Sequence, residues 1–406
     1  MRYLALLRGP YVVRLLAGTL VGRLPSGMTA LVIALALREA GAPYSRIGAV
    51  TAAYAVASAV GGPALGRLVD RAGQPRVLLS SACVAGLGYA LLAVAPGNAA
   101  AAFGGAVLAG AAMPPLEPCL RALWPEIVAK EQLDTAYAFD SASQQLLYVV
   151  GPLAVAVVAA VASPATALWI AAGLGLAGAL VVATAAPARQ WTAPPRGAGA
   201  GLLGPLRSTG LVLLLVGLAG AGWALGAQAV LYVAYAEAHA GELSGGAGTL
   251  LAVAAFGGLV GALVYGAVPW RGRAAGGLPV WALASVMAAG FIALVLLPPP
   301  GVMTVLSFFA GLGLAPLLAV SFALIGELAP PGTTTEAFAW LVTVIAAGNA
   351  AGAATAGVLV DGSLRSAAVC GAAGITLGAV LLRTTRHRLL PPSPDPVTAE
   401  ALPTTG

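Results

Sequence analysis

Charged residues are too rare in this chain for its surface to face water. Of its 406 residues, 8% are charged and 60% are hydrophobic, whereas an ordinary soluble domain carries about 25% charged residues. A soluble fold of this length needs charged and polar side chains to cover its surface. Because the apolar runs are continuous rather than alternating, the sequence also excludes a membrane β-barrel. We therefore expect an integral membrane protein built from helices.

Proline, glycine and charged residues divide the chain into twelve apolar segments. A helix needs roughly 20 apolar residues to cross a bilayer. The segments lie near residues 11–36, 47–69, 76–95, 99–121, 136–161, 165–186, 208–235, 246–268, 277–297, 301–325, 335–360 and 366–383. The predicted fold class is therefore all-α, with twelve transmembrane helices. Pro114, Pro115 and Pro118 should bend the fourth segment, and Pro316 should bend the tenth.

Positive charge marks one side of the predicted membrane protein. Basic side chains resist translocation, and most fall in loops on the side of the amino terminus: Arg2, Arg8, Arg67, Arg71, Arg76, Arg121, Lys130, Arg189, Arg196, Arg207, Arg271, Arg273, Arg383, Arg386 and Arg388. Only Arg38, Arg46 and Arg365 fall in loops on the other side. We predict a multi-pass protein of the inner or plasma membrane with both termini cytoplasmic. Since the basic residues are scattered through short loops, the net charge of +6 does not indicate a nucleic-acid partner.

The second half of the chain repeats the first. At an offset of 200, and of 201 after one slip, the matched pairs include Gly61 with Gly261, Gly66 with Gly266, Arg71 with Arg271, Gly110 with Gly311, Pro115 with Pro316 and Glu126 with Glu327. Six segments per half predict two parallel six-helix repeats with a site between them near the midplane. The predicted parts are an N-terminal six-helix bundle (1–186), a flexible cytoplasmic linker (187–207), a C-terminal six-helix bundle (208–390) and a disordered tail (391–406).

One loop carries a specific motif, Gly66-Arg-Leu-Val-Asp70-Arg71-Ala-Gly73-Gln-Pro-Arg76. Its glycines allow close helix approach and a tight turn, and its acid can form switchable ion pairs. The motif resembles the loop signature of the major facilitator superfamily, although Gln and Pro replace two usual basic positions. The resemblance implies that two bundles rock about a central site and that Asp70 and Arg71 latch the cytoplasmic side in the outward-facing state. The alternative is a basic turn that only sets topology.

Two further features bear on this resemblance. The matching loop of the second half has Trp270 where Asp70 would be. Because tryptophan cannot form the ion pairs of an acid, we expect any latch in that loop to be degraded. In the fifth segment, Gly151-Pro152 is similar to a fragment of the signature found in drug-exporting antiporters of the superfamily. The flanking glycines of that signature are mostly missing, and the alternative is that Pro152 only kinks the helix.

Charges inside the segments are the first candidate site residues, because intramembrane charge is costly and usually functional. Arg14 lies near the start of its segment and can extend its head group to the interface. Arg23 lies roughly 18 Å inside a core about 30 Å thick, so it must face a wet cavity, a partner acid or both. Glu117 either lines the cavity or pairs with Arg121 one turn later.

A polar stripe in the fifth segment gives further candidates. Asp140, Gln144 and Tyr148 follow one another at one-turn spacing, which places them on one helical face. The stripe predicts a cavity wall or a proton path, and the alternative is polar packing between helices. In the repeat, Tyr148 matches Asn349 of the second half, which we include among the candidates.

The second half offers mainly aromatic and uncharged polar candidates. Trp223 stands where the repeat places Arg23, Gln228 follows on the same segment, and Phe308 and Phe309 lie on another. A charged wall facing an apolar, aromatic wall suits an amphipathic organic molecule. The alternative is that these aromatic side chains face lipid or the core.

The predicted function is secondary active transport of a small organic compound by alternating access. The sequence has no Walker loop, dinucleotide fingerprint, zinc spacing or nucleophile elbow, so we expect no enzyme activity, metal or cofactor. The family implies coupling to an ion gradient, and we expect this gradient to be one of protons. Asp140 or Glu117 would take the proton, and Arg23 would bind the carboxylate or an anionic group of the substrate. We favour proton-coupled export by a monomeric antiporter. The alternatives are a uniporter or importer of the same fold, and a non-transporting sensor or scaffold.

Overall fold

The computed structural model describes residues 2–195, 204–243, 246–268, 279–360 and 362–389, and its elements in these ranges are helices. They are α1 (Arg2–Leu7), α2 (Val12–Glu39), α3 (Tyr44–Ala72), α4 (Gln74–Val94), α5 (Ala99–Ala111), α6 (Leu116–Ile127), α7 (Leu133–Val161), α8 (Pro164–Ala183), α9 (Ala186–Gln190), α10 (Thr209–Ala238), α11 (Gly246–Ala267), α12 (Val280–Leu294), α13 (Pro300–Leu312), α14 (Leu314–Leu328), α15 (Thr334–Val360) and α16 (Leu364–Thr384). Short 3-10 turns span Lys130–Gln132, Gly204–Arg207 and Arg386–Leu389. The predicted tail and part of the linker lie outside the described residues.

These helices form a membrane protein. In the described ranges, ten helical spans are long and apolar enough to cross a bilayer. Shorter apolar helical stretches occur at Val150–Val161, within α7, and in α12. The prediction of an all-α integral membrane fold is confirmed, and the count of twelve crossings stays a prediction.

Polar side chains at the helix starts explain several boundaries. Ser163 and Ser363 accept hydrogen bonds from the backbone N–H three residues later, at 3.1 Å in each case. Asn98 and Ser208 cap α5 and α10 in the same way. Each cap satisfies an N–H group that the helix leaves unpaired.

Two spans are broken at equivalent places. The predicted fourth segment becomes α5 and α6, separated at Pro114 and Pro115, which confirms the expected bend. The predicted tenth segment becomes α13 and α14, separated at Gly313 shortly before Pro316. Because proline lacks an N–H group and crowds the preceding turn, each break interrupts the helical hydrogen bonds near the middle of a span.

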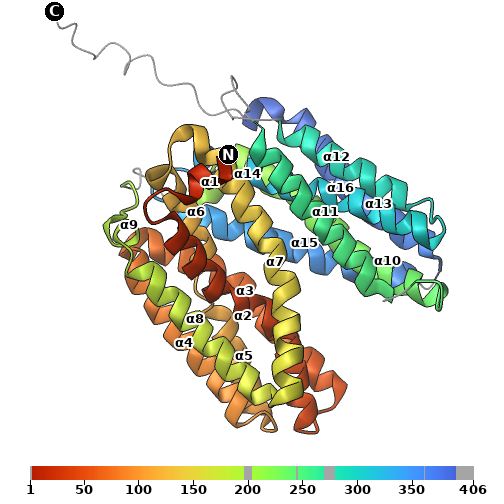
Figure 1. Ribbon diagram of the computed structural model, residues 1–406, viewed down its shortest axis with the longest axis horizontal. Helices are drawn as coiled ribbons and strands as arrows, with labels where there is room; N and C mark the ends of the chain where they lie inside the picture. The colour runs from red at the N-terminus through yellow and green to blue at the C-terminus, as the bar shows by residue number, and fades with distance from the viewer. Residues whose placement is uncertain (1, 196–203, 244–245, 269–278, 361, 390–406) are drawn as a thin grey trace, which may run out of the picture.

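Figure 1 shows the long helices in two groups, which meet near α1 and α14 and diverge away from that end. We call α2–α8 the first group, α10–α16 the second group, and the end that carries α1 the terminal end. The largest buried apolar cluster crosses between the groups there and includes Trp124, Tyr137, Phe322 and Phe338. A separate cluster around Met28 and Tyr89 belongs to the first group alone. The groups are therefore packed together at the terminal end.

Glycines that match in the repeat hold equivalent helix pairs together. A Cβ on Gly61 of α3 would overlap the backbone of Ala111 in α5. In the second group, a Cβ on Gly261 of α11 would overlap the backbone of Leu312 in α13. Both glycines let two helix backbones touch, which a larger residue prevents.

The substitution Gly110→Ala should destabilise the fold, and Gly104→Ala on the same helix should not. A Cβ on Gly110 would overlap the carbonyl oxygen of Tyr54, whereas a Cβ on Gly104 meets nothing within 4 Å. Overpacking costs about 1–3 kcal/mol, and alanine otherwise favours a helix over glycine. Thermal unfolding of the purified protein in detergent should show a lower midpoint for Gly110→Ala only. Equal midpoints would contradict the close α3–α5 contact.

Candidate functional site

Four buried charged side chains of the first group form a single network. Arg23 of α2 pairs with Glu117 of α6, and Glu117 also pairs with Arg121 one turn later. Arg121 Nε donates a hydrogen bond to Asp140 Oδ2 of α7 at 2.7 Å. The exposed fractions are 7%, 6%, 1% and 2%, respectively. We call these four residues the buried charge network.

The network carries two positive and two negative charges, so its formal charge is zero. A charge in hydrocarbon is tolerated when an opposite charge accompanies it. The partner acid expected for Arg23 is Glu117, and the spacing of Glu117 and Arg121 does produce an ion pair. Within the described part of the chain, Arg23 Nη1 and Arg121 Nη1 are buried without a hydrogen-bond partner. The network thus has spare cationic N–H donors.

Arg121 also contacts the second group. Its guanidinium carbon lies 3.4 Å from the centre of the Phe322 ring, which belongs to α14. Phe322 meets Tyr137 of α7 edge-on at 6.0 Å and Phe338 of α15 at 6.4 Å. A cation over an aromatic face is attracted by the ring electrons, the more strongly where water is excluded. The charges of the first group are therefore joined to the second group through one aromatic ring.

The other predicted candidates lie on α7, α10 and α15. Gln144 is half-buried on α7, and the side chain of Tyr148 lies outside the described residues. Gln228 is buried and donates a hydrogen bond to the Tyr232 hydroxyl at 2.8 Å within α10. Asn349 of α15 is exposed. The roles of these four side chains at a substrate site stay predictions.

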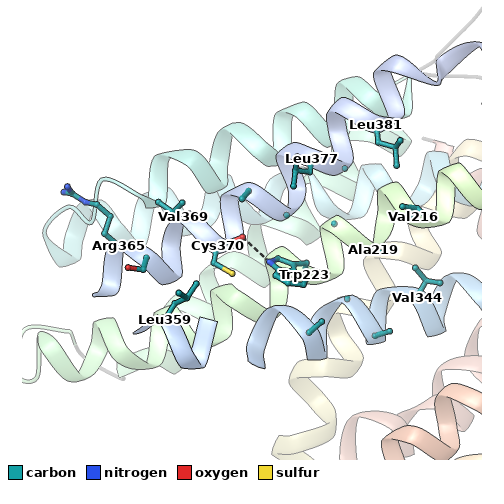
Figure 2. A pocket seen from close by; sticks show the side chains of 18 of the residues that line it. Val216, Ala219, Trp223, Val344, Leu359, Arg365, Val369, Cys370, Leu377 and Leu381 are labelled. Carbon is teal, nitrogen blue, oxygen red and sulfur yellow. Dashed lines mark hydrogen bonds between the residues drawn. The ribbon is translucent and has the colours of Figure 1, made fainter. Parts of the chain in front are cut away.

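Trp223 lies in a groove of the second group (Figure 2). The groove has a volume of about 1000 Å³ and is lined by mainly apolar and small residues of α10, α15 and α16. Trp223 Nε1 donates to the carbonyl oxygen of Cys370 at 3.1 Å, and Arg365 lies at one end of the groove. None of the four network residues lines it. In this structure Trp223 is thus separate from the network, and Phe322 is the aromatic residue that meets the charges.

The predicted gate motif contacts the start of α15 in the second group. Asp70 accepts hydrogen bonds from the backbone N–H groups of Thr335 and Glu336 at 3.1 and 3.0 Å. A carboxylate is stabilised at this position by the unpaired N–H groups and by the helix dipole. Gly66 allows the approach, because a Cβ there would lie 2.9 Å from Glu336 Cα. Thr333 and Glu336 have the spacing of a capping box, but the Glu336 N–H donates to Asp70.

The cation of this latch is Arg67. Its Nε and Nη2 donate to the two carboxylate oxygens of Glu336 at 3.1 and 2.5 Å. This parallel, two-bond geometry is the strongest form of arginine–carboxylate contact. Arg71 and Arg76 are exposed, and Gly73 has the positive φ of 83° that separates α3 from α4. The expectation that Arg71 contributes the positive charge is corrected: the latch consists of Arg67, Asp70, Glu336 and the first turn of α15.

The role of Arg67 could have been inferred from its spacing to Asp70, although the family motif draws attention to Arg71. Arg67 precedes Asp70 by three residues, so both side chains lie on the same face of α3. Arg71 follows Asp70 directly and points elsewhere. The pairing of Glu336 could not be inferred from nearby residues, because its partner Arg67 lies far away in the sequence.

Known proteins share this fold. The family model of the Major Facilitator Superfamily matches residues 15–300. No curated protein matches the chain. Among solved structures, a bacterial homologue of the iron transporter ferroportin in an outward-facing state is similar, with 14% identity, 92% of this chain and 99% of that chain covered, and a TM-score of 0.72.

Two further structures share the fold. A human organic anion transporter is 17% identical, with 91% of this chain and 98% of that chain covered and a TM-score of 0.64. A proton:xylose symporter is 17% identical, with 92% of this chain and 94% of that chain covered and a TM-score of 0.65. At these identities the likeness shows the fold alone.

The fold and its ten apolar spans within the described ranges define a multi-pass membrane protein. Since the family model covers well over half of the sequence, the chain belongs to the major facilitator superfamily. It is accordingly a secondary transporter.

The substitution Arg121→Met should destabilise the protein more than Arg23→Met. Without Arg121, Asp140 loses its ion-pair partner in a buried site, and breaking such a pair costs about 3–5 kcal/mol. Without Arg23, Glu117 keeps Arg121. The thermal midpoint in detergent should fall more for Arg121→Met than for Arg23→Met. The double variant Arg121→Met/Asp140→Leu should recover part of the loss. The exposed Arg14 gives the control Arg14→Met, and a midpoint for Arg121→Met equal to this control would refute the network.

The substitution Glu336→Gln should open the terminal end. In a chain whose three native cysteines are replaced by alanine, Ala142→Cys reports on opening, because Ala142 is buried against Ala262 and Ala315 of the second group. Loss of the charged pair with Arg67 should raise the rate of maleimide labelling about tenfold. The control is Glu327→Gln, an exposed acid of α14. If both variants label at the same rate, the pair does not hold this end closed.

Proposed function

We propose that the chain is a proton-coupled transporter of small organic compounds that carry an anionic group. The observation that carries this proposal is the buried charge network: two arginines with spare N–H donors, balanced by two carboxylates. An anionic substrate would bind the spare donors. A carboxylate displaced from its arginine in a buried site would then take up a proton, because an unpaired buried charge is costly.

Asp140 is the proposed proton acceptor. Protonation would cancel its attraction for Arg121 and free the Nε donor that now binds Oδ2. Glu117 would keep its pair with Arg23 and hold α2 against α6. In this scheme the proton and the anion favour the same state of the network, so they cross the membrane in the same direction.

Coupling between the network and the closed end would pass through Phe322. A change in the pairing of Arg121 alters its contact with the Phe322 ring, and with it the attachment of α14 to the first group. The latch would then release or form as the groups rock. The binding of a charged substrate would thus change the contacts at the gate through Arg121, Phe322 and α14.

The proposal includes the orientation of the protein. We infer twelve crossings in the cell membrane, in two parallel six-helix bundles at 1–186 and 208–390 joined by a linker at 187–207 and followed by the tail 391–406. We also infer cytoplasmic termini, because most basic residues fall in loops on that side. The closed terminal end would then be cytoplasmic and the conformation outward-facing, as in the similar structure of the ferroportin homologue. A monomer is sufficient for this mechanism, and we infer the substrate, protons and the lipid bilayer as its partners.

Export in exchange for protons is the second candidate. It is the direction favoured by the Gly151-Pro152 fragment, and it requires substrate and proton to compete for one site. A cationic substrate would compete, because it would bind the carboxylates of Asp140 or Glu117. In the structure Gly151 also has a packing role, since a Cβ there would lie 2.7 Å from the backbone of Gly27.

The sign of proton movement distinguishes the two candidates. Liposomes that contain the purified protein and a trapped pH-sensitive dye are given a panel of organic anions and organic cations. Acidification of the lumen on addition of an anion supports co-transport, and alkalinisation on addition of a cation supports exchange. If no compound in the panel changes the luminal pH, proton coupling is refuted.

The substitution Asp140→Asn should uncouple transport from protons. Asparagine keeps the shape and can still accept a hydrogen bond from Arg121, but it cannot be protonated. We expect accumulation driven by the proton gradient to fall about tenfold or more, while exchange of labelled for unlabelled substrate continues. The control is Glu126→Gln, an exposed acid on α6. Accumulation by Asp140→Asn at the control level would place the coupling proton elsewhere.

A further inference from the structure

The second group lacks the charged residues of the latch. In the repeat, the matched pairs are Gly66 with Gly266, Arg67 with Ala267, and Asp70 with Trp270. Trp270 itself lies outside the described residues. The glycine that permits close approach is thus kept, and neither charged residue is.

The end of α11 nevertheless packs closely against α7 of the first group. Thr135 Oγ1 donates a hydrogen bond to the carbonyl oxygen of Gly266 at 3.0 Å. A Cβ on Gly266 would lie 2.8 Å from the Cβ of Ala138. Thr135 matches Glu336 at the offset of 201, so this contact mirrors the one between Gly66 and the start of α15. Where the first joint uses the Asp70 carboxylate, this contact uses the neutral Thr135 hydroxyl, with Asp134 next to it in the first turn of α7.

The first helix, α1, adds a second contact to this joint. The Tyr3 hydroxyl lies against Gly266 and donates to the carbonyl oxygens of Ala262 and Leu263 at 3.2 and 2.8 Å. Its ring packs against Phe139 of α7 with 5.9 Å between centroids. Leu6, one turn further, is fully buried. The amino-terminal helix therefore touches both groups across the place where they join.

Tyr3 is suited to act as a hydrogen-bond donor here. Burial raises the pKa of its hydroxyl to about 12, so the proton stays on the oxygen at physiological pH. Each helical carbonyl oxygen has a second lone pair, so Ala262 and Leu263 can accept from Tyr3 and keep their helical hydrogen bonds. The contact can form and break without unwinding α11.

We propose that α1 is a strap, with Tyr3 as its positioning residue, that holds α11 to α7 when the terminal end is closed and so replaces the missing latch of the second group. The closed end then has one joint with a charged side-chain pair, between α3 and α15, and one joint that Thr135 and Tyr3 make through their hydroxyl groups, between α11 and α7. The proposal rests on the alternating access proposed above. Its test measures opening directly and needs no transported compound, so it can fail or succeed independently of the transport assays.

The test is maleimide labelling of Ala142→Cys in the cysteine-free chain, with Tyr3→Phe as the variant. Phenylalanine keeps the ring against Phe139 and removes only the hydroxyl. We expect the labelling rate to rise several-fold and the thermal midpoint to stay unchanged. Tyr11→Phe, at an exposed tyrosine of the same amino-terminal segment, is the matched control and should leave the rate unchanged. Thr135→Val removes the other hydroxyl of the joint and should add to the effect of Tyr3→Phe.

The outcomes are separable. Faster labelling of Tyr3→Phe at an unchanged thermal midpoint supports the strap, and a still faster rate for the double variant supports a shared joint. An unchanged labelling rate for Tyr3→Phe overturns the proposal. A rate increase that accompanies a fall in the midpoint also overturns it, because Tyr3 would then serve only the stability of the fold.

Discussion

The pairing of Arg121 is the interaction on which the rest of the site depends. Its guanidinium joins two carboxylates from different helices, Glu117 and Asp140, and its face covers Phe322 of the second group. In a low-dielectric interior, neither carboxylate is stable in its ionised form without a cation beside it. One side chain therefore satisfies the electrostatics of α6 and α7 and also attaches the first group to the second. A change in any one of these contacts alters the others.

The joints at the terminal end use backbone groups as partners, and this suits a contact that must open. Asp70 binds two N–H groups at the start of α15, and Tyr3 binds two carbonyl groups of α11. Backbone groups at fixed positions on a rigid helix need no rearrangement to receive a partner. The pair of Arg67 and Glu336 joins two side-chain charges across the groups, so screening by salt should weaken this joint.

Much of the fold could be predicted because it follows from burial and repetition. Apolar runs indicated the spans, prolines located the break between α5 and α6, and a depth estimate required a partner for Arg23. The position of Trp223 could not be predicted, because its helix α10 is apolar all round and gives no sign of which face meets the other group. Arg67 and Phe322 were missed because their partners are distant in sequence, and only the packed structure brings Arg67 to Glu336 and Phe322 to Arg121.

The comparison of the two halves separates what the fold needs from what the site needs. Glycines such as Gly61 and Gly261 are kept in both halves, because each allows one helix backbone to touch the next and any side chain would prevent it. The charges are not kept: Arg23, Glu117 and Asp140 match Trp223, Leu318 and Leu341. Symmetric packing is compatible with an asymmetric site, because helix packing constrains the size of the matched side chains and the site constrains their charge. With both cations and both acids in the first half, a single protonation event changes one bundle only. The second half can then respond as a rigid body through Phe322 and the joints at the terminal end.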